Sequence, residues 1–573
     1  MKKRIEIISG AVLCLLYFIS CNTGTSSTGD SAISTDSATI AAGEASFTQY
    51  CSGCHNFRSD GIGPELGGLT ASVSTDWIQH FIRDPKKIIE SGDVRARELL
   101  KTYKVAMPSF PNLSDSQVKR IIAFLNIHKL HGYHKSNSDA KAIINPVPDS
   151  IRLSGLVVGL GLVTQILPSS DSGKSPLTRI TKLDCEPHTG APFILDLRGK
   201  LYKLKNNEPV VYMDMAKLMP KFINEPGLAT GFGSFAFHPD FDKNGLLYTT
   251  HTEAPNSGKA DFSYADSIKV TVQWVLTEWK TENPNADTFS GKGRELFRIN
   301  MVTGIHGVQE ITFNPLAKAG DEDYGLLYIG VGDGGSVEQG YPFIPHSKAK
   351  PWGTVLRIYP AGHNSTNGQY GIPQNNPFAK SQNTLGEIYA YGFRNPHRIT
   401  WGKSGQMLVC NIGQANIESV NLILPGHDYG WPIREGTFLQ DPNSDLSKVY
   451  PLPANDSINN ITYPVAQFDH DEGKAITGCL EYWGTAIARL KGKYFFGDIP
   501  SGRLFYIDIA DVKPGKQATI KEWKISVNGV PKTLKELCGN DRVDLRFGRD
   551  ARGDLYIMTK ADGKVYKLTG ARM

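Results

Sequence analysis

The hydrophobic pattern of this chain changes near residue 150, and this change constrains the fold more than any other feature. Before it, apolar residues recur at helical spacing, as at positions 77–82 and 118–125. After it, short apolar runs follow Gly-containing turns, as at 246–249 and 326–331. The sequence therefore predicts a multidomain protein, with a small all-α domain followed by a large all-β domain.

The chain divides into five segments, and its 573 residues exceed what one core usually organises. In the small domain, Ser114 and Gln117 have the spacing of a capping box and mark the start of the last helix. The predicted segments are an export signal at 1–21, a Ser/Thr-rich tether at 22–43, the helical domain at 44–130, a polar linker at 131–150 and the β domain at 151–573.

The first residues have the pattern of an export signal. Basic residues 2–4 precede an apolar stretch, and Ser20 stands directly before Cys21. The run 18–21 resembles a lipobox, so we expect a lipoprotein-type signal that leaves Cys21 lipidated; an ordinary cleaved signal is the alternative. We therefore expect a bacterial envelope protein, periplasmic or anchored to the outer membrane through Cys21.

Charge and cysteine content narrow the possible partners. The net charge of +5 comes from 62 basic and 57 acidic residues, a near-balance that argues against a nucleic-acid partner. Disulfides are permitted in an exported protein, and the four cysteines of the β domain allow three pairings or free thiols. These cysteines are Cys185, Cys410, Cys479 and Cys538.

Residues 51–55 read Cys-Ser-Gly-Cys-His, which is the attachment motif for a c-type haem. The thiols of Cys51 and Cys54 add to the porphyrin vinyl groups, and His55 on the same turn binds the iron. A structural zinc site would need a further ligand pair nearby, which the sequence lacks. The sequence therefore predicts covalent haem c.

Met107 is the candidate for the sixth iron ligand, because it is the only methionine between the motif and the end of the helical domain. A thioether ligand raises the iron potential and suits electron transfer. His80 and His128 are competing ligands, and core packing is the other explanation for Met107. Residues 44–129 as a whole resemble class I cytochrome c, with Gly-Pro-Glu-Leu after the motif and Met-Pro before the last helix.

The large domain has the pattern of a β-propeller, whose blades are four-stranded sheets around a channel. A stretch of about 420 residues at ~50–70 per blade predicts six to eight blades. The β domain has no Gly-x-Gly-x-x-Gly motif between a strand and a helix, which argues against a nicotinamide or flavin site. Fusion to a one-electron carrier favours an oxidoreductase.

Seven segments of the β domain resemble the glucose and sorbosone dehydrogenases, the soluble quinoprotein sugar dehydrogenases. The resemblance implies a six-bladed propeller that holds pyrroloquinoline quinone (PQQ) and calcium in a cleft on its top face. The segments are Phe-Ala-Phe-His-Pro-Asp-Phe at 235–241, Ile-Gly-Val-Gly-Asp-Gly-Gly at 329–335, Gly-Phe-Arg-Asn-Pro at 392–396, Asp-Tyr-Gly-Trp-Pro at 428–432, Lys-Ala-Ile-Thr-Gly at 474–478, Gly-Lys-Tyr-Phe-Phe-Gly-Asp at 492–498 and Asp-Leu-Arg-Phe-Gly at 544–548.

The resemblance also implies catalytic roles. His306 corresponds to a general base that removes the hydroxyl proton while hydride leaves the sugar carbon, and imidazole suits that task near neutral pH. Asp333 would orient this ring. Arg394 would hold the oxygen on which charge develops, and Asn395 would hydrogen-bond the cofactor.

Cofactor ligands follow from the same resemblance. Lys474 matches the family's lysine, and Arg542 and Arg546 are further candidates to bind the carboxylates of PQQ. Calcium maps to the backbone carbonyls of Gly413 and Gln414.

The predicted function is a quinohaemoprotein dehydrogenase that oxidises an aldose or related sugar or alcohol at PQQ. Its electrons pass through the haem to an external acceptor, such as another cytochrome or a respiratory component. The alternative is a cytochrome joined to a quinone-free propeller that binds a glycan or a protein. Residues 230–234 and 307–310 depart from the family pattern, which bears on PQQ retention. Convergence of the catalytic candidates and Lys474 on one cleft would favour the enzyme.

Overall fold

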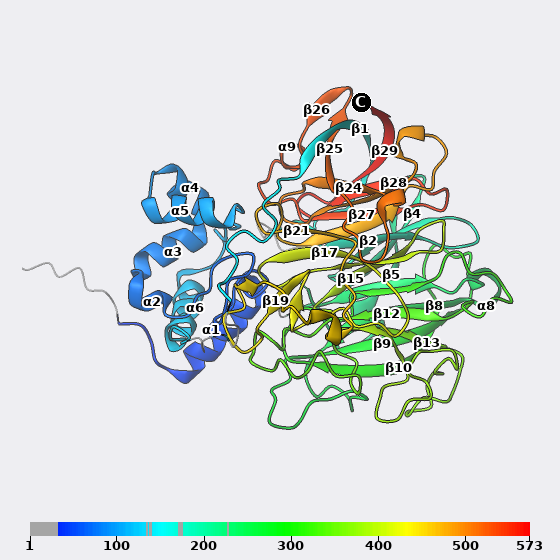
Figure 1. Ribbon diagram of the computed structural model, residues 1–573, viewed down its shortest axis with the longest axis horizontal. Coiled ribbons are helices and arrows are strands. Elements are labelled where there is room, and N and C mark those ends of the chain that lie inside the picture. The colour runs from blue at the N-terminus through cyan, green and yellow to red at the C-terminus, as the bar shows by residue number, and fades with distance from the viewer. Residues whose placement is uncertain (1–31, 133–135, 137–139, 170–175, 226–228) are drawn as a thin grey trace, which may run out of the picture.

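The computed structural model describes residues 32–573 except 133–135, 137–139, 170–175 and 226–228. The export signal and Cys21 lie outside the described residues, so lipidation and envelope location stay predictions. Within the described part of the chain, no helix combines the length and apolar character needed to cross a membrane. Figure 1 shows a helical lobe beside a larger β-rich lobe.

The helical domain packs its first helix against its last. Its helices are α1 (Ser37–Tyr50), α2 (Leu69–Ser72), α3 (Thr75–Arg83), α4 (Pro85–Glu90), α5 (Val94–Tyr103) and α6 (Asp115–Ile127). The predicted capping box starts α6: Ser114 accepts from the Gln117 N–H, and the Gln117 side chain accepts from the Ser114 N–H. The apolar face of α6 then buries Val118 and Ile121 beside Phe47 of α1.

The tether predicted for 22–43 is wrong from Ser37 onward, because α1 begins there. Asp36 caps this helix by accepting a hydrogen bond from the Thr39 N–H at 2.8 Å. The small residues of this segment allow close packing: a Cβ on Gly43 would lie 2.0 Å from the Arg120 carbonyl oxygen of α6. A segment with few large apolar residues is therefore part of the core.

The principal described strands of the large domain form six four-stranded blades. The first blade is β2 (Ile180–Cys185), β3 (Pro192–Asp196), β4 (Lys200–Lys205) and β5 (Glu208–Asp214), and the second is β7 (Phe232–Phe237), β8 (Leu246–Glu253), β9 (Val272–Thr281) and β10 (Gly291–Met301). The third is β11 (Glu310–Phe313), β12 (Leu327–Val331), β13 (Thr354–Ile358) and β14 (Ile388–Tyr391), and the fourth is β15 (Pro396–Trp401), β16 (Met407–Asn411), β17 (Ile417–Leu422) and β21 (Ala466–Asp469). The fifth is β22 (Ile476–Glu481), β23 (Lys493–Asp498), β24 (Leu504–Asp508) and β25 (Lys521–Val527), and the sixth is β27 (Leu545–Arg549), β28 (Leu555–Thr559), β29 (Lys564–Arg572) and β1 (Arg152–Gln165).

Shorter elements decorate the blades. They are β6 (Phe222–Ile223), β18 (Arg434–Glu435), β19 (Phe438–Gln440), β20 (Val449–Tyr450), β26 (Val530–Lys532), α7 (Met215–Leu218), α8 (Phe241–Asn244), α9 (Leu534–Cys538), and the 3-10 turns η1 (Asp456–Asn459), η2 (Ala488–Leu490) and η3 (Ile509–Asp511).

Strand β1 closes the ring. It comes from the start of the β domain but pairs antiparallel with β29 at the chain's end, with Val158 opposite Ala571. The first and last segments of the domain thus share one blade, which ties the circle of blades together. The predicted all-α domain followed by a propeller is confirmed.

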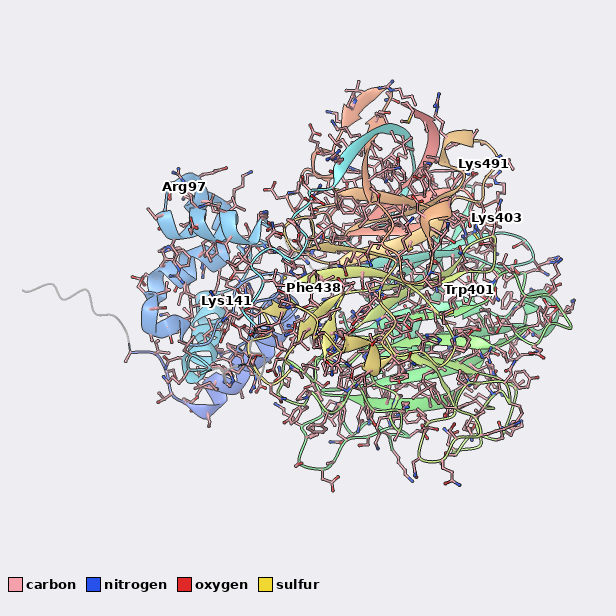
Figure 2. The ribbon with its side chains drawn as sticks, in the orientation of Figure 1. Arg97, Lys141, Trp401, Lys403, Phe438 and Lys491 are labelled. Carbon is pink, nitrogen blue, oxygen red and sulfur yellow. The ribbon has the colours of Figure 1, made fainter. Side chains whose placement is uncertain are left out.

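Polar side chains from different blades meet along the propeller axis. Lys182 of β2 and Arg398 of β15 both pair with Glu310 of β11, at 2.7 Å and 3.2 Å. All three are buried, so ion pairs connect the first strands of three blades. Figure 2 shows Arg97 on the helical lobe, with Lys403 and Lys491 toward the opposite end of the molecule.

The four cysteines of the β domain are free thiols in this structure. Cys410 and Cys479 are buried in one apolar cluster between the fourth and fifth blades, and their thiols hydrogen-bond to each other. Cys185 and Cys538 lie elsewhere and are partly exposed.

Candidate active site and haem pocket

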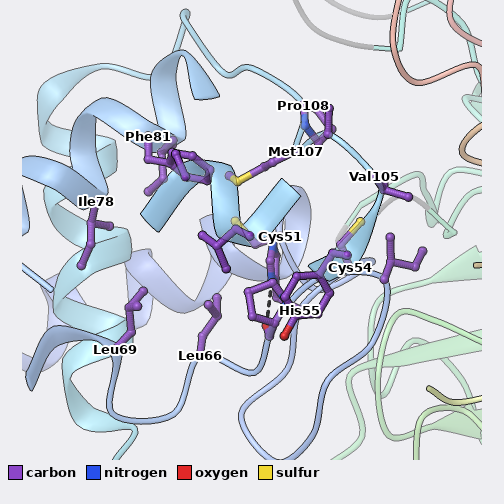
Figure 3. Close-up of a pocket in the computed structure, with 18 of the residues that line it drawn as sticks. Cys51, Cys54, His55, Leu66, Leu69, Ile78, Phe81, Val105, Met107 and Pro108 are labelled. Carbon is purple, nitrogen blue, oxygen red and sulfur yellow. Dashed lines mark hydrogen bonds between the residues drawn. The ribbon is translucent and has the colours of Figure 1, made fainter. Parts of the chain in front are cut away.

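The helical domain contains an apolar cavity of about 1090 Å³ built around residues 51–55. These residues follow α1 in a tight turn, where the His55 N–H donates to the Cys51 carbonyl at 3.0 Å. The turn brings Cys51, Cys54 and His55 to one wall of the cavity (Figure 3). This is the arrangement that covalent haem attachment requires.

His55 is oriented for iron binding. Its Nδ1 lies 2.9 Å from the Pro64 carbonyl oxygen, which leaves Nε2 for a metal. A Cβ on Gly63 would lie 2.4 Å from the imidazole Cε1, so glycine is needed for this close approach. Burial also lowers the pKa of His55, which favours the neutral ring that binds iron.

Met107 lines the same cavity, whereas His80 and His128 do not. His128 instead stacks on Phe57, with ring centroids 3.6 Å apart. The geometry therefore favours Met107 over the two histidines as the sixth ligand. With two thiols, one imidazole and one thioether in an apolar cavity, the residues fit haem c.

A second cavity, of about 1100 Å³, lies between the helical domain and the propeller. We call it the cleft. Its walls come from both domains: residues 52–56, 61 and 62 on the helical side, and the blades on the other. Among the residues predicted for the active site, the cleft brings together His306, Arg394, Asn395, Gly413, Gln414, Lys474, Arg542 and Arg546.

Asp333 lies directly behind His306. Its Oδ1 is 2.8 Å from Nδ1 of His306, and its Oδ2 accepts a hydrogen bond from Nε1 of Trp431 at 3.0 Å. Burial opposes ionisation of Asp333, but His306, Arg394 and the Gly335 N–H outweigh it and lower the pKa of this carboxyl. The imidazole is thus held by a buried carboxylate.

The His306 backbone is held as tightly as its ring. The Gly334 N–H donates to the His306 carbonyl at 3.2 Å. A Cβ on Gly332 would lie 2.2 Å from that carbonyl oxygen. His306 itself has a φ of 50°, a conformation that L residues adopt rarely. The glycines around 330–335 therefore place this ring at the edge of the cleft.

Arg394 is fixed by three acceptors. Its Nε donates to Gln414 Oε1 at 2.8 Å, its Nη1 to the Gly413 carbonyl at 2.6 Å and its Nη2 to Glu338 Oε1 at 2.5 Å. The Gly413 carbonyl predicted to bind calcium therefore faces a guanidinium. Within the described residues there is also no cluster of three or more His, Cys, Asp or Glu side chains suited to a metal. The Gly413 carbonyl is thus already engaged by a cationic side chain, and calcium stays a prediction.

The cleft carries an excess of positive charge. Six of the lining side chains are Lys or Arg, against two carboxylates, Glu338 and Asp544. Burial, followed by repulsion from Arg398, lowers the pKa of Arg546 to about 9, and burial lowers the pKa values of Lys474 and Lys560. A lowered pKa means that nearby carboxylates only partly neutralise the positive charge of these buried groups. The cleft therefore fits an anion with several carboxylates, as PQQ has.

Several contributors to the cleft were missed by sequence reasoning, among them His397, Lys560 and Glu338. His397 directly follows the Gly-Phe-Arg-Asn-Pro segment, is buried, and has no hydrogen-bond partner for either ring nitrogen among the described residues. Lys560 and Glu338 line the cleft from positions with no motif of their own. Only His397 had a sequence signal, its adjacency to a segment already recognised. An unsatisfied buried imidazole there indicates a ligand-binding surface.

Contacts between the domains hold the helical domain over the cleft. Lys269 pairs with Glu44 at 2.8 Å, and Lys104 pairs with Asp471 at 3.0 Å. Next to the cleft, Gln414 Nε2 donates to Ser59 Oγ at 3.2 Å. The same Gln414 side chain binds Arg394, so one residue joins the proposed catalytic arginine to the helical domain.

Comparison with known proteins identifies both domains. HIPL1 protein of Arabidopsis thaliana is 25% identical over 375 residues, which cover 57% of this chain and 52% of that protein. Quinoprotein glucose dehydrogenase B of Acinetobacter calcoaceticus is 23% identical over 333 residues, covering 55% and 64%. The chain thus spans between about half and two thirds of the length of these relatives.

The apo crystal structure of the soluble Aldose sugar dehydrogenase from Escherichia coli has a TM-score of 0.49 and 17% identity, covering 73% of this chain and 99% of that one. Residues 40–129 match the Cytochrome c family. Residues 193–567, more than half of the chain, match the family described as Glucose / Sorbosone dehydrogenase. The protein therefore belongs to the Glucose / Sorbosone dehydrogenase family and carries an N-terminal cytochrome c domain.

Proposed function

We propose that this protein is a quinohaemoprotein dehydrogenase. It oxidises an aldose or a related sugar or alcohol with PQQ and delivers the electrons through its haem c to an external one-electron acceptor. The observation that carries this proposal is the cleft itself, where an imidazole held by a buried carboxylate faces a group of undercompensated cations. Bound PQQ would supply the two-electron acceptor for the hydride that leaves the sugar carbon.

His306 is proposed as the general base. Asp333 occupies Nδ1, so Nε2 is the nitrogen available to take the proton of the substrate hydroxyl. Asp333 stabilises the imidazolium that results and keeps the ring oriented. The pair therefore supports removal of the hydroxyl proton at the moment when hydride departs.

Arg394 is proposed to hold the oxygen on which negative charge develops. Its three acceptors fix the guanidinium before any substrate arrives. A charge that is fixed in place beforehand stabilises a developing anion without reorganising. Asn395 lines the same cleft and is proposed to hydrogen-bond the cofactor.

Lys474, Arg546 and Lys560 are proposed to bind the carboxylates of PQQ, because their charges lack full compensation within the protein. Calcium is a prediction from family resemblance alone, and we assign it no step. The substrate class rests on family membership and on a relative that is named for glucose.

We also propose that the protein works at the bacterial envelope, tethered through lipidated Cys21. The support is the sequence pattern of residues 1–21.

The test is the haem absorption spectrum of the protein loaded with PQQ, recorded anaerobically before and after an aldose is added. We expect haem reduction that requires PQQ and is lost in His306→Ala. A His306→Ala protein that retains its haem spectrum and its PQQ affinity shows that the loss is chemical. An intact c-type spectrum with no PQQ binding and no response to any sugar would reject the enzyme in favour of the quinone-free binding module.

A further inference from the structure

The haem pocket and the cleft share one wall. Four residues line both cavities: Cys54, His55, Ile62 and Arg542. One layer of side chains therefore separates the space that fits haem from the space that fits the quinone. Figure 3 shows Cys54 at the side of the haem pocket where propeller strands come into view.

Arg542 forms the propeller's part of this wall. It lies in the loop between α9 and β27, where Asp544 Oδ1 accepts from its Nε at 2.9 Å. Its Nη1 lies 3.2 Å from Cys54 Sγ. In the mature protein this sulfur is expected to be the thioether that joins the porphyrin edge to the chain. The edge of the haem is thus expected to meet the propeller at the cleft.

Two exposed ion pairs connect the domains outside the cleft. Glu44 is on α1 and Lys104 ends α5, so the pairs Glu44–Lys269 and Lys104–Asp471 anchor two separate parts of the helical domain. None of these four residues lines the cleft or the haem pocket. The charges of Glu44 and Lys269 can therefore be changed without altering either site directly, whereas Asp471 and Lys104 also act on the pKa of Lys474 in the cleft.

We propose that electrons cross from the cleft to the haem within one chain, through the wall formed by Cys54, His55, Ile62 and Arg542, while the cytochrome domain stays docked. The inference rests on the proposed function and adds its electron route. Oxidation of a CH–OH group to C=O releases two electrons and two protons. Bound haem would accept one electron at a time, so an external one-electron acceptor would have to remove the first electron before the second one crosses.

Concentration dependence provides the first test. The PQQ-loaded protein is mixed with an aldose in a stopped-flow instrument, and haem reduction is followed at several protein concentrations. A crossing within one chain gives a rate constant that does not change with protein concentration. A rate constant that rises in proportion to concentration would show transfer between molecules and overturn the inference.

Charge reversal provides the second test. Glu44→Lys combined with Asp471→Lys places like charges opposite Lys269 and Lys104. Because like charges in contact oppose docking, we expect haem reduction to slow by about tenfold. Because Asp471 and Lys104 act on Lys474, sugar oxidation is measured at saturating PQQ with a small dye that accepts electrons directly from the cleft, and it should not fall. Adding Lys269→Glu and Lys104→Glu restores both pairs and should restore the rate of haem reduction.

Small-angle scattering of the unloaded proteins gives a readout that needs no turnover. The double variant should be more extended than the wild type, and the fourfold variant should return to wild-type dimensions. An undocked double variant whose haem is reduced as fast as in the wild type would overturn the inference. Absence of both dye and haem reduction in the wild type would instead reject the proposed function and this inference with it.

Discussion

The Nδ1 atom of His306 lies 2.8 Å from Oδ1 of Asp333, and the other carboxylate oxygen accepts from the Trp431 indole at 3.0 Å. One oxygen of the Asp333 carboxylate is thus held by the indole of Trp431, which forms a cis peptide bond with Pro432, and the other oxygen faces the imidazole. This relationship ties the orientation of the His306 ring to side chains from two other segments of the propeller.

The His306–Asp333 pair predicts that substituting either residue lowers the rate of sugar oxidation, for a different reason in each case. His306→Ala should lower sugar oxidation by about 10²–10⁴-fold, the usual contribution of a general base. Asp333→Asn should cause a loss of up to about 10⁴-fold, because an amide stabilises the wrong tautomer. Dye-coupled turnover measures both. His238→Asn is the matched control: His238 hydrogen-bonds within its own turn to Asp240 and Asn244 and lies away from the cleft. Full activity in His306→Ala would exclude this residue as the base.

Removing a buried cation should weaken PQQ binding without lowering the thermal stability of the protein. We expect Arg546→Gln and Lys560→Gln each to weaken PQQ binding by about 10–100-fold, the cost of a lost charge-assisted hydrogen bond. The cofactor-free variants should melt at or above the wild-type temperature, because an undercompensated buried charge is gone. Calorimetric titration and thermal unfolding measure the two effects, with exposed Lys491→Gln as control. Unchanged PQQ affinity in both variants would remove these residues from the binding site.

The pKa of Lys474, which burial lowers from its usual value, predicts how PQQ binding depends on pH. A bound carboxylate favours the charged ammonium, so PQQ binding raises this pKa and takes up a proton at higher pH. Affinity should therefore fall as pH rises through the lowered pKa. Without cofactor the folded protein releases this proton at a lower pH than the unfolded chain does, so the cost of burying this charge falls as pH rises through that range. Titrations of PQQ at several pH values, with circular dichroism to check folding, measure the slope. In Lys474→Gln the part of the slope due to this residue should vanish.

Met107→Ala should leave the haem covalently attached but open a coordination position. We expect the reduction potential to fall, because the thioether that stabilises ferrous iron is lost. The absorption spectrum and a redox titration measure the change, and added imidazole should bind the open iron. Neighbouring Val105→Ala, which also lines the pocket, serves as the size control. A Met107→Ala spectrum identical to the wild type would assign the sixth ligand elsewhere.

Gly332→Ala should disturb His306 rather than unfold the protein. A Cβ at this position would lie 2.2 Å from the His306 carbonyl oxygen, so that segment must move. We expect a destabilisation of about 1–3 kcal/mol, typical of overpacking, together with a larger proportional loss of sugar oxidation. Thermal melting and turnover measure the two effects. The control is Gly405→Ala, where a Cβ meets nothing within 4 Å and the positive φ adds only backbone strain. Unaltered turnover in Gly332→Ala would show that the His306 position tolerates movement.

The sequence predicted the order of the domains, the haem motif and eight propeller residues that line the cleft, because each belongs to a contiguous segment with its own chemistry. Residues 51–55 and the Gly-Phe-Arg-Asn-Pro segment are of this kind. Lys560 and Glu338 were not predictable in the same way, since each reaches the cleft only through the packing of its blade. Gly43 was assigned to a tether because small residues resemble a linker until the helix they contact is known.

The hydrogen bond between Arg394 and the Gly413 carbonyl could not be predicted from the sequence either. A backbone carbonyl has no identity in a sequence, and only the folded chain shows that Arg394 donates to it. The placement of the cytochrome domain over the cleft depends on contacts separated by hundreds of residues, such as Arg542 with Cys54. No local pattern encodes such a contact.

Residues 52–55 belong to the haem attachment motif and also to the wall of the cleft. The two domains are therefore not interchangeable modules. Grafting another cytochrome onto this propeller would replace part of the wall around the reacting groups, and a substitution selected for its effect on the haem would also reshape the neighbouring cleft. Evolution of the electron carrier and of the catalytic domain is constrained at the same few positions.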